Sequence, residues 1–463
     1  MRRIKNLGFY ILNKVQREEE KMYILSADFG TSSIKIAILD KNANIVETTK
    51  VEYQYHAFNQ DWVEIDINEV FNAMLTGIKN LSKYLNNIDV ISYDTFSPSM
   101  IFMDKDGEAL YPIITHLDRR SKKQTTKILN EMGKETFQSI TGIQPFTGGA
   151  SITTVLWMME NMPDLFKKTY KFGHLNTYIY HKLTGCFATD PTNAAMMGMY
   201  ETTKWGTWSK DIYKTFGIPE NKLPDIFNAG TIIGVLNKEM AELTGLQVGI
   251  PVVLGSNDVA TAQIGAGNIN EGDILNISGS SEMISIISDK PIVSDSYYLR
   301  NAITPGKWQI YATTLGGFAI DWFRKEFYRD QDIDYFFNVE FPNVIKNNIG
   351  EKAVKFAPYL VGDRQSLTPQ KASFSGITLD TKREDFLAGI LLGIQEPILK
   401  TLELTNKFMK HNKTIKLTGG MSNSSFINVK RELFKDFDFV IKEDCPIVGN
   451  AILALQALEG YRK

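Results

Sequence analysis

The chain has 463 residues, of which 43% are hydrophobic and 22% are charged, and its formal net charge is −2 at pH 7. This length is sufficient for two domains with separate cores. The balanced charge offers no broad basic surface for nucleic acid, and no apolar run is long enough to cross a bilayer. Two cysteines, five histidines and no CxxC pair argue against a disulfide framework and a structural zinc site. These features predict a cytoplasmic protein.

The first 21 residues differ in character from the rest of the chain. They begin with basic residues and contain one short apolar patch, Leu7 to Leu12, without a small-residue cleavage site. This pattern does not match a signal peptide. We predict an N-terminal extension over residues 1–21, with the folded protein starting near Met22.

After this extension, strand and helix patterns mix in the way that is typical of an α/β fold. The apolar run from Tyr23 to Ala27 predicts a buried strand, residues 28–33 a polar turn, and Ser33 to Leu39 a second strand. A helical pattern covers Ile67 to Asn86, and the stretch from Ser151 to Leu183 is mostly helical.

The opening pattern recurs in the second half of the chain. YILSADFGTSSIKIAILDK, from Tyr23, and GDILNISGSSEMISIISDK, from Gly272, share a strand, a turn rich in Gly, Ser and Thr, a second strand and a final Asp-Lys. Chance likeness between two hairpins is the alternative, but the matching positions at the head of each half favour a duplicated domain. The boundary is predicted near residues 254–265, with domains over 22–256 and 257–463.

Each copy of this pattern places hydroxyl and amide donors in a tight turn: Gly30-Thr31-Ser32-Ser33 after Asp28, and Gly279-Ser280-Ser281. Such turns let backbone N–H groups approach an anion closely. Burial of the Asp28 carboxylate would need compensation, which a divalent metal beside phosphate could supply. For either stretch alone, an ordinary hairpin turn is the commoner explanation. Two such turns facing each other across a cleft would clamp a polyphosphate.

Asp258 follows the apolar run from Val252 to Ser256, at the predicted domain junction, where clefts usually form. Phosphoryl transfer needs a group that orients and deprotonates the attacking hydroxyl. The alternative is that Asp258 caps a helix over residues 259–265. The local sequence supports the two roles about equally, and one residue can serve both.

Three further segments carry candidate binding residues. The glycine pairs Gly316-Gly317 and Gly419-Gly420 each precede a predicted helix, where a flat ring could lie against the backbone. A plain strand-to-helix turn is the alternative for both. Asp118 could accept hydrogen bonds from sugar hydroxyls, and Arg119 could donate hydrogen bonds to them. A solvated charge cluster is, however, the more common explanation of such a run.

Taken in order, the segments ADFGTSSIKIAILD, HLDRRS, GSNDVATAQIGAG, NISGSSEM and LTGGMSNSSF resemble the FGGY family of carbohydrate kinases. The likeness runs from Tyr23 to about Leu458. It implies two ribonuclease H-like (actin-like ATPase) domains with ATP and Mg²⁺ in a central cleft. It also implies an enzyme that transfers the γ-phosphoryl group of ATP to a hydroxyl of a small sugar.

The resemblance also implies roles for individual residues. Asp258 would be the catalytic base, and Asp28 and Asp258 would lie at the metal. The implied nucleotide-binding residues are Gly30, Thr31, Ser32, Ser33, Lys35, Gly279, Ser280, Ser281, Gly317, Asp321, Gly419, Gly420 and Ser424. The implied acceptor-binding residues are Ser97, Ser99, Asp118, Arg119, Asn257 and Asp258.

The acceptor region departs from familiar members of that family. Xylulokinase-like members carry Met-His-Gly, and glycerol kinase-like members an Arg-Glu pair, where this chain has Ser97-Pro98-Ser99. Several members have Asn or Gln at Val259, and the usual Trp is His116 here. The best guess is a ketopentose such as xylulose; gluconate, glycerol or another polyol is the alternative. An actin- or chaperone-like ATPase and a non-catalytic sugar sensor are alternatives of another class. A homodimer would be unsurprising for the family.

Overall fold

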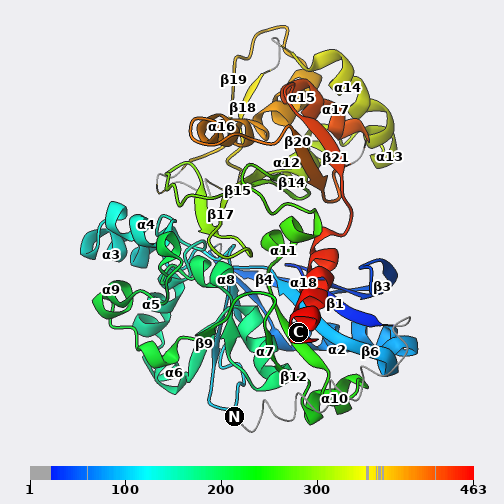
Figure 1. Ribbon diagram of the computed structural model, residues 1–463. Coiled ribbons are helices and arrows are strands. Elements are labelled where there is room, and N and C mark those ends of the chain that lie inside the picture. The colour runs from blue at the N-terminus through cyan, green and yellow to red at the C-terminus, as the bar shows by residue number, and fades with distance from the viewer. Residues whose placement is uncertain are drawn as a thin grey trace. The chain divides into compact units, whose positions relative to one another are not determined.

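The computed structural model describes residues 22–59, 61–350, 354–360, 362, 367, 370–422 and 424–462. Contacts divide the chain into two compact units (Figure 1). Unit 1 contains the chain up to Gly267 together with Arg300–Gly306 and Cys445–Lys463, and unit 2 contains Asn268–Leu299 and Lys307–Asp444. The predicted extension over residues 1–21 lies outside the described residues.

Unit 1 is built on a six-stranded sheet in the order β12-β13-β6-β1-β2-β3. β1 pairs antiparallel with β2 and parallel with β6, which in turn pairs parallel with β13. The central strands are rich in buried, β-branched residues, which suit a sheet covered on both faces. The strands are β1 Tyr23–Phe29, β2 Ser33–Leu39, β3 Ile45–Glu52, β6 Ile88–Thr95, β12 Ile232–Val235 and β13 Pro251–Asn257.

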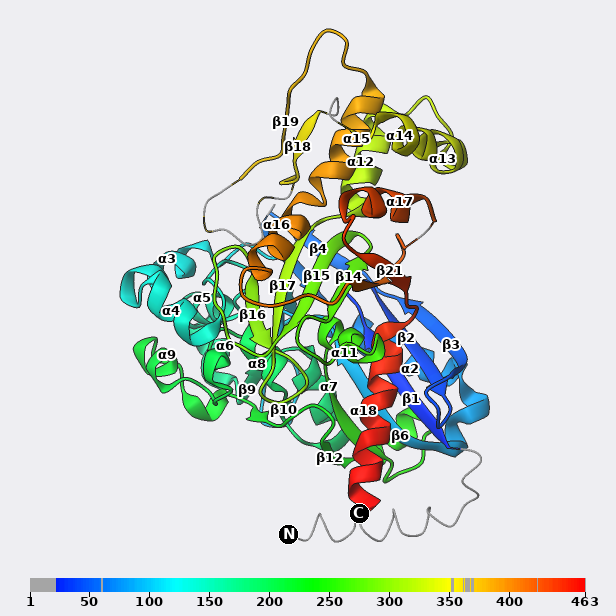
Figure 2. The same cartoon turned by 45° about the horizontal axis from the view of Figure 1, so that its top comes forward.

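Helices cover both faces of this sheet because successive strand residues point to opposite sides. Leu25 joins the core that includes side chains of α2 and α7, whereas its neighbour Ile24 joins the core that includes Ile447 and Ala451 of α18. Figures 1 and 2 show α18, in red, running along β1 and β6. The helices are α2 Ile67–Asn80, α7 Leu175–Thr184, α10 Lys238–Thr244, α11 Asp258–Gly265 and α18 Cys445–Arg462.

The rest of unit 1 is a five-stranded sheet, β4-β5-β8-β7-β9, with a two-stranded sheet and short helices. The strands are β4 Tyr55–Phe58, β5 Trp62–Ile65, β7 Ser99–Met103, β8 Ile113–Thr115, β9 Lys171–Gly173, β10 Ala188–Thr189 and β11 Asp225–Ile226. The helices are α3 Lys122–Glu131, α4 Lys134–Thr141, α5 Ile152–Asn161, α6 Pro163–Lys168, α8 Pro191–Met196 and α9 Lys210–Thr215, with 3₁₀ turns η1 Ser82–Asn87, η2 Thr202–Lys204 and η3 Glu220–Lys222.

Unit 2 is built on the sheet β16-β17-β15-β14-β20-β21, beside a small β18-β19 ribbon. The strands are β14 Ile274–Ser278, β15 Ser281–Ser288, β16 Tyr298–Asn301, β17 Trp308–Leu315, β18 Lys355–Ala357, β19 Ser373–Ser375, β20 Thr414–Thr418 and β21 Asp438–Ile441. The helices are α12 Gly317–Phe327, α13 Ile333–Tyr335, α14 Phe341–Asn348, α15 Arg383–Gly393, α16 Glu396–Thr405 and α17 Ser424–Leu433, with a π-helical turn η4 Phe336–Glu340.

The two large sheets repeat one arrangement. In unit 1 the run β3-β2-β1-β6-β13 is paired antiparallel, antiparallel, parallel and parallel, in that order. In unit 2 the run β17-β15-β14-β20-β21 has the same sequence of pairings. This repetition confirms the predicted α/β fold with two duplicated, ribonuclease H-like domains. In the part of the chain that is described, no helix combines the length and apolar character needed to cross a membrane.

Several boundaries differ from the prediction. β1 continues to Phe29, so Asp28 lies in the strand and not in the turn, and α2 ends at Asn80 before a separate 3₁₀ turn. The contact division falls after Gly267, not after Ser256. The last helix, α18, belongs to unit 1 and not to the second domain, because its apolar side chains pack on β1 and β6.

Candidate active site

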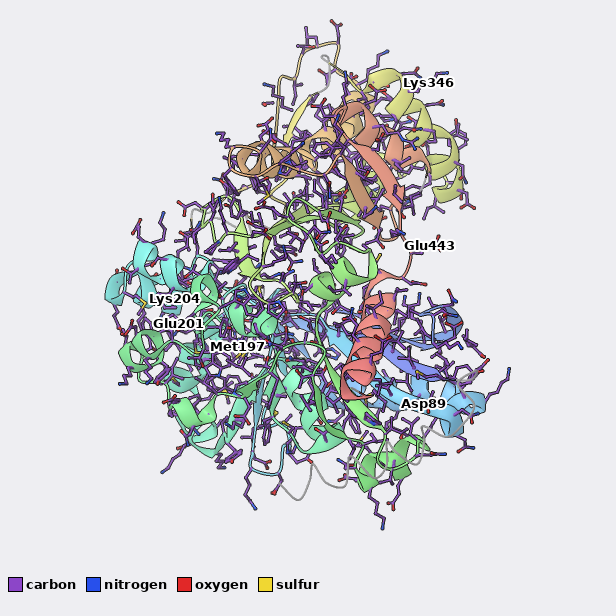
Figure 3. The ribbon with its side chains drawn as sticks, viewed as in Figure 1. Asp89, Met197, Glu201, Lys204, Lys346 and Glu443 are labelled. Carbon is purple, nitrogen blue, oxygen red and sulfur yellow. The ribbon has the colours of Figure 1, made fainter. Side chains whose placement is uncertain are left out.

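Three aspartates of unit 1 are placed by the carboxyl ends of adjacent parallel strands. Asp28 on β1 is in register with Asp94 on β6, and Asp258 follows β13, the next strand. By contrast Asp89, labelled in Figure 3, lies near the start of β6 and accepts a hydrogen bond from the N–H of Tyr23 at 3.0 Å. The parallel pairing of the sheet therefore assembles a carboxylate cluster from distant parts of the sequence.

Asp258 is the first residue of α11. Its Oδ1 accepts a hydrogen bond from the N–H of Val259 at 2.7 Å, but the N-cap of the helix is Asn257, whose side chain accepts from the same N–H at 3.1 Å. The capping role considered for Asp258 therefore belongs to Asn257. Burial and then the charge of Asp28 raise the pKa of Asp258 to about 6, against the opposing effects of the Val259 hydrogen bond and the positive charge of Arg300.

Asp94 is a site residue that the sequence analysis missed. Its side chain is fully buried, and its Oδ2 accepts a hydrogen bond from Nδ2 of Asn450 on α18. Its Oδ1 receives no hydrogen bond from an N–H or hydroxyl group in the described part of the chain, and its carboxyl group faces that of Asp28. Burial, followed by the charges of Asp28 and Asp258, raises the pKa of Asp94 well above its usual range. The only signal in the sequence was an acidic residue at the end of an apolar run.

Arg300 is a second residue that the sequence analysis missed. Its side chain is buried, and its positive charge acts on Asp258. The next residue, Asn301, fixes the segment within unit 1, because its carbonyl accepts from Oγ1 of Thr192 at 2.9 Å and its Nδ2 donates to the carbonyl of Thr202 at 3.3 Å. No local pattern marked this arginine in the sequence.

The first predicted phosphate turn connects β1 to β2. The N–H of Gly30 donates to the carbonyl of Ser33 at 2.9 Å, and Tyr53 holds the turn from outside through its N–H to Ser32 and its hydroxyl to Gly30. The chain conformation is thus fixed while the Ser32 side chain remains exposed. The predicted residues in or beside this turn are Gly30, Thr31, Ser32, Ser33 and, in register with Asp28 on β2, Lys35.

The structure brings together only some of the predicted acceptor residues. Nδ2 of Asn257 donates to Oγ of Ser97 at 2.8 Å, so these two lie side by side beside Asp258. Ser99 is fully buried, and its Oγ donates to the carbonyl of Phe96 and accepts from the N–H of Leu175. Ser99 therefore supports the local fold and offers no free hydroxyl to a ligand.

The carboxylate of Asp118 forms an internal ion pair. Nε and Nη2 of Arg120 donate to it at 2.7–3.0 Å, and Nη2 also donates to Oε1 of Glu64 at 2.6 Å. The guanidinium lies 4.0 Å above the ring of Trp62 and is 1% exposed. Arg119 instead donates through Nη1 to two main-chain carbonyls of its own loop. Asp118 and Arg119, both predicted to contact sugar hydroxyls, thus use these groups in hydrogen bonds within the protein.

In unit 2, three glycine-containing turns meet at the carboxyl ends of β14, β17 and β20. The N–H of Gly317 donates to the carbonyl of Gly279 at 2.8 Å, and the N–H of Met421 donates to the carbonyl of Ser278 at 2.9 Å. A Cβ atom at Gly419, whose φ is +103°, would lie 2.4 Å from the carbonyl oxygen of Ser278, so only glycine allows this approach. The predicted residues that these turns contain are Gly279, Ser280, Ser281, Gly317, Gly419 and Gly420.

The two other predicted nucleotide residues lie on the helices that follow these turns. Ser424 is the first residue of α17. On α12, Oδ2 of Asp321 accepts from Nζ of Lys325 at 2.6 Å, and Oδ1 accepts from Nη2 of Arg324 at 3.2 Å. Burial alone would raise the pKa of Asp321, but these two cations lower it. A Cβ atom at Gly420 would meet nothing within 4 Å, so space remains open there.

The geometry can now be compared with known proteins. The family model for the "FGGY family of carbohydrate kinases, N-terminal domain" matches residues 23–265, which is more than half of the chain. This chain belongs to the FGGY family of carbohydrate kinases. It is therefore an enzyme that transfers a phosphoryl group to a carbohydrate hydroxyl, as predicted.

Other FGGY kinases match nearly the whole chain. The xylulose kinase of Staphylococcus xylosus is 23% identical over 93% of this chain and 90% of its own length. The gluconokinase of Bacillus licheniformis is 26% identical over 94% of this chain and 87% of its own length. The crystal structure of Plasmodium falciparum glycerol kinase with ADP matches with a TM-score of 0.82 at 22% identity, covering 95% of this chain and 91% of that one. The last comparison confirms the fold.

The family match favours the carbohydrate kinase prediction over an actin- or chaperone-like ATPase. The named relatives act on different acceptors, so their names are consistent with both the ketopentose prediction and the alternatives. Among the described residues of this FGGY kinase, no group of three or more His, Cys, Asp or Glu side chains is arranged to hold a metal. Any metal would need ligands from bound phosphates or water as well.

Proposed function

We propose that this kinase transfers the γ-phosphoryl group of MgATP to a hydroxyl of a small sugar, with Asp258 as the general base. The observation that carries the proposal is the environment of Asp258 at the end of β13, where burial and Asp28 raise its pKa to about 6. A carboxylate with this pKa is mostly ionised at pH 7 and is still basic enough to accept a proton in the transition state.

The acceptor oxygen would attack the γ-phosphorus in line, its proton would pass to Asp258, and ADP would leave. Asn257 and Ser97, which are hydrogen-bonded to each other, would orient the hydroxyls beside the reacting one. Positioning of this kind supplies much of the rate enhancement in phosphoryl transfer.

The donor set in unit 1 fits Mg²⁺. Asp28 and Asp258 provide hard oxygen ligands, and Mg²⁺ usually takes only one or two carboxylates together with phosphates and water. Asp94, whose carboxyl group faces that of Asp28, adds a third buried carboxyl group beside them. Mg²⁺ at these residues would neutralise charge on the phosphate oxygens.

The unit 2 turns support the assignment of a nucleotide. The hydroxyls of Ser280 and Ser281 suit phosphate oxygens, and the open space at Gly420 suits a flat ring. The glycerol kinase with a similar fold was crystallised with ADP, which supports the same choice here.

We propose a ketopentose such as xylulose as the acceptor, a choice supported by the xylulose kinase of S. xylosus. Gluconate is the second candidate, with glycerol and other polyols behind it. One observation favours gluconate: the buried guanidinium of Arg300 acts on Asp258, and such a cation suits a substrate carboxylate. The gluconokinase of B. licheniformis supports the same alternative.

An ADP-release assay over xylulose, other ketoses, gluconate and glycerol tests the proposal. We expect one acceptor class to stimulate ADP release, and Asp258→Asn to lower kcat about 10²–10⁴-fold with that acceptor. Asp89→Asn, at the other end of β6, is the matched control and should keep wild-type kcat. Wild-type kcat in Asp258→Asn would reject the assignment. ATP hydrolysis that no sugar stimulates would favour an ATPase, and sugar binding without turnover a sensor.

A further inference from the structure

Beneath the second phosphate turn, unit 2 contains an ion pair that is completely shielded from water. Nζ of Lys430 on α17 donates to Oε1 of Glu282 on β15, and both side chains are 0% exposed. The ammonium also donates to Oδ1 of Asn276 at 2.7 Å and to Oε1 of Gln395 at 3.2 Å. All three hydrogen atoms of the ammonium are thus used inside the protein, so Lys430 is not available to a ligand.

Glu282 connects this ion pair to the turn itself. It pairs across the hairpin with Ser278, and these two residues flank Gly279–Ser281. Its Oε2 accepts from Oγ of Ser278 at 2.7 Å, while Oε1 accepts from Nδ2 of Asn276 at 2.7 Å. One carboxylate therefore fixes both ends of the turn. Among the groups that contact this carboxylate here, Lys430 is the cation that balances its charge.

The same pair connects the turn to a second nucleotide-binding candidate. Lys430 lies on α17, the helix that follows Gly419-Gly420, and the N–H of Met421 donates to the carbonyl of Ser278. Side-chain contact through Lys430 and main-chain contact through Met421 thus join α17 to the strand end that precedes the turn. A shift of α17 would be transmitted to the turn by two independent connections.

A buried ion pair is weak evidence for stability, because apolar residues of similar volume often serve as well or better. Here burial lowers the pKa of Lys430 despite Glu282, which shows that the pair is costly to bury. The pair does fix geometry, because its hydrogen bonds reach the end of β14, the end of the turn and α17. We propose that Lys430 and Glu282 are positioning residues that hold the Gly279–Ser281 turn and α17 in the arrangement that binds nucleotide.

This inference rests on the proposed assignment of the turn to nucleotide, so the test begins with wild-type protein. Titration calorimetry with ADP and with ATP, both with Mg²⁺, should show binding; no binding of either would reject the proposed function. The variants Lys430→Met, Glu282→Gln and their combination should raise the Kd for ADP about 10-fold or more. The KM for the sugar should stay within about 2-fold of wild type, because the acceptor residues lie in unit 1.

The matched control is Asp273→Asn. Asp273 precedes β14, roughly 20 Å along that strand from the turn. It is also a buried carboxylate with several hydrogen bonds, from Ile269, Asn270 and Asn412. It should lower Tm and leave the Kd for ADP unchanged. Equal losses of Tm in Lys430→Met and Asp273→Asn, with wild-type Kd in both, would overturn the proposal and leave a purely structural pair.

If the charge variants do not fold, Ser278→Ala keeps the test decisive. It removes the hydroxyl that joins the turn to Oε2 of Glu282 and leaves the ion pair and the strand intact. A rise of about 3-fold or more in the Kd for ADP, with unchanged sugar KM, supports the proposal. A wild-type Kd in Ser278→Ala contradicts it.

Discussion

The aspartates of unit 1 show how one residue type takes different roles according to the groups that face it. Asp118 meets the guanidinium of Arg120 and is neutralised within the protein. Asp94 and Asp258 are buried and also face Asp28, so their pKa values rise. A carboxylate that is opposed by another carboxylate remains available for proton transfer or for a metal, whereas one that is paired with arginine does not.

The pH dependence of catalysis follows from Asp258. Because the ionised form is the proposed base and the pKa is about 6, kcat/KM should be constant above pH 7 and fall about 10-fold per pH unit below 6. Initial rates from pH 5 to 8 with saturating MgATP measure this. The activity that remains in Asp258→Asn should lack the inflection. A flat wild-type profile across this range would contradict the assignment.

The same raised pKa predicts a stability change. Asp258 binds its proton more tightly in the folded state than in the unfolded chain, where its pKa is about 3.9. The folded state therefore loses stability as pH rises from about 4 to 6, and the full cost is present above pH 6. Asp258→Asn should stabilise the ligand-free protein by about 1–3 kcal/mol at pH 8, and by less at pH 5. Urea unfolding at the two pH values tests the sign; destabilisation at pH 8 would refute it.

Arg120 is predicted to be a stability residue. Arg120→Met would leave Asp118 and Glu64 buried without their cation, at a cost of about 3–5 kcal/mol. Lys122→Met is the control, because the ion pair between Lys122, at the start of α3, and Asp61, between β4 and β5, is exposed and should contribute less than about 1 kcal/mol. Urea unfolding measures both. Similar losses of unfolding free energy in the two variants would show that the buried ion pairs contribute no more stability than the exposed one.

At the scale of elements, α11 and α18 approach each other through two glycines. A Cβ atom at Gly265 would lie 1.9 Å from the carbonyl oxygen of Cys445, and one at Gly449 would lie 2.1 Å from that of Thr261. This close contact holds the helix that begins at Asp258 against the helix that carries Asn450, the partner of Asp94. Two elements that are far apart in the sequence thus set the position of the carboxylate cluster.

Gly449→Ala should disturb this contact. Overpacking costs about 1–3 kcal/mol, and a displaced α11 should lower kcat about 10-fold or more, since small misplacements of reacting groups are costly. Gly460→Ala on the same helix meets nothing within 4 Å and should be neutral or slightly stabilising. Thermal unfolding and kcat measure both effects. A Gly449→Ala variant with wild-type kcat would show that α11 does not depend on this contact.

Local patterns predicted most elements but not the contacts between them. The strands of both hairpins and the helix after Gly316 follow from periodicity and from glycine turns. Asp94 was missed because an acid at the end of an apolar strand gives no sign of which strand will lie beside it. The ion pair of Arg120 was missed because its partner Glu64 is distant in the sequence. Side-chain pairing across a sheet depends on register, which the sequence of one strand does not contain.

At the scale of the whole molecule, the duplicated topology could be predicted because each half begins with the same hairpin. The final helix could not be assigned correctly, because its contacts join residues such as Ser26 and Ile447, which are 421 positions apart. Its position at the end of the chain favoured an assignment of α18 to the second domain. In the structure, the apolar face of α18 instead completes the core of unit 1.

Truncation tests this assignment. A chain that ends at Asp444 lacks α18 and should not form a cooperatively folded unit 1, because Ile447, Ala451 and Ala454 fill the core over β1 and β6. A chain that ends at Leu458 keeps these residues and is the control. Near-ultraviolet circular dichroism and limited proteolysis report the difference. A cooperative unit 1 in the shorter chain would mean that α18 is dispensable.

The late position of α18 also has a consequence for synthesis. The ribosome completes unit 2, which ends at Asp444, before it makes the helix that unit 1 needs. At ordinary elongation rates, roughly 10–40 s pass between the emergence of Gly267 and that of Arg462. During this interval β1 and β6 of the nascent chain have an uncovered apolar face. The first half of this kinase therefore completes its core only when its last residues are made.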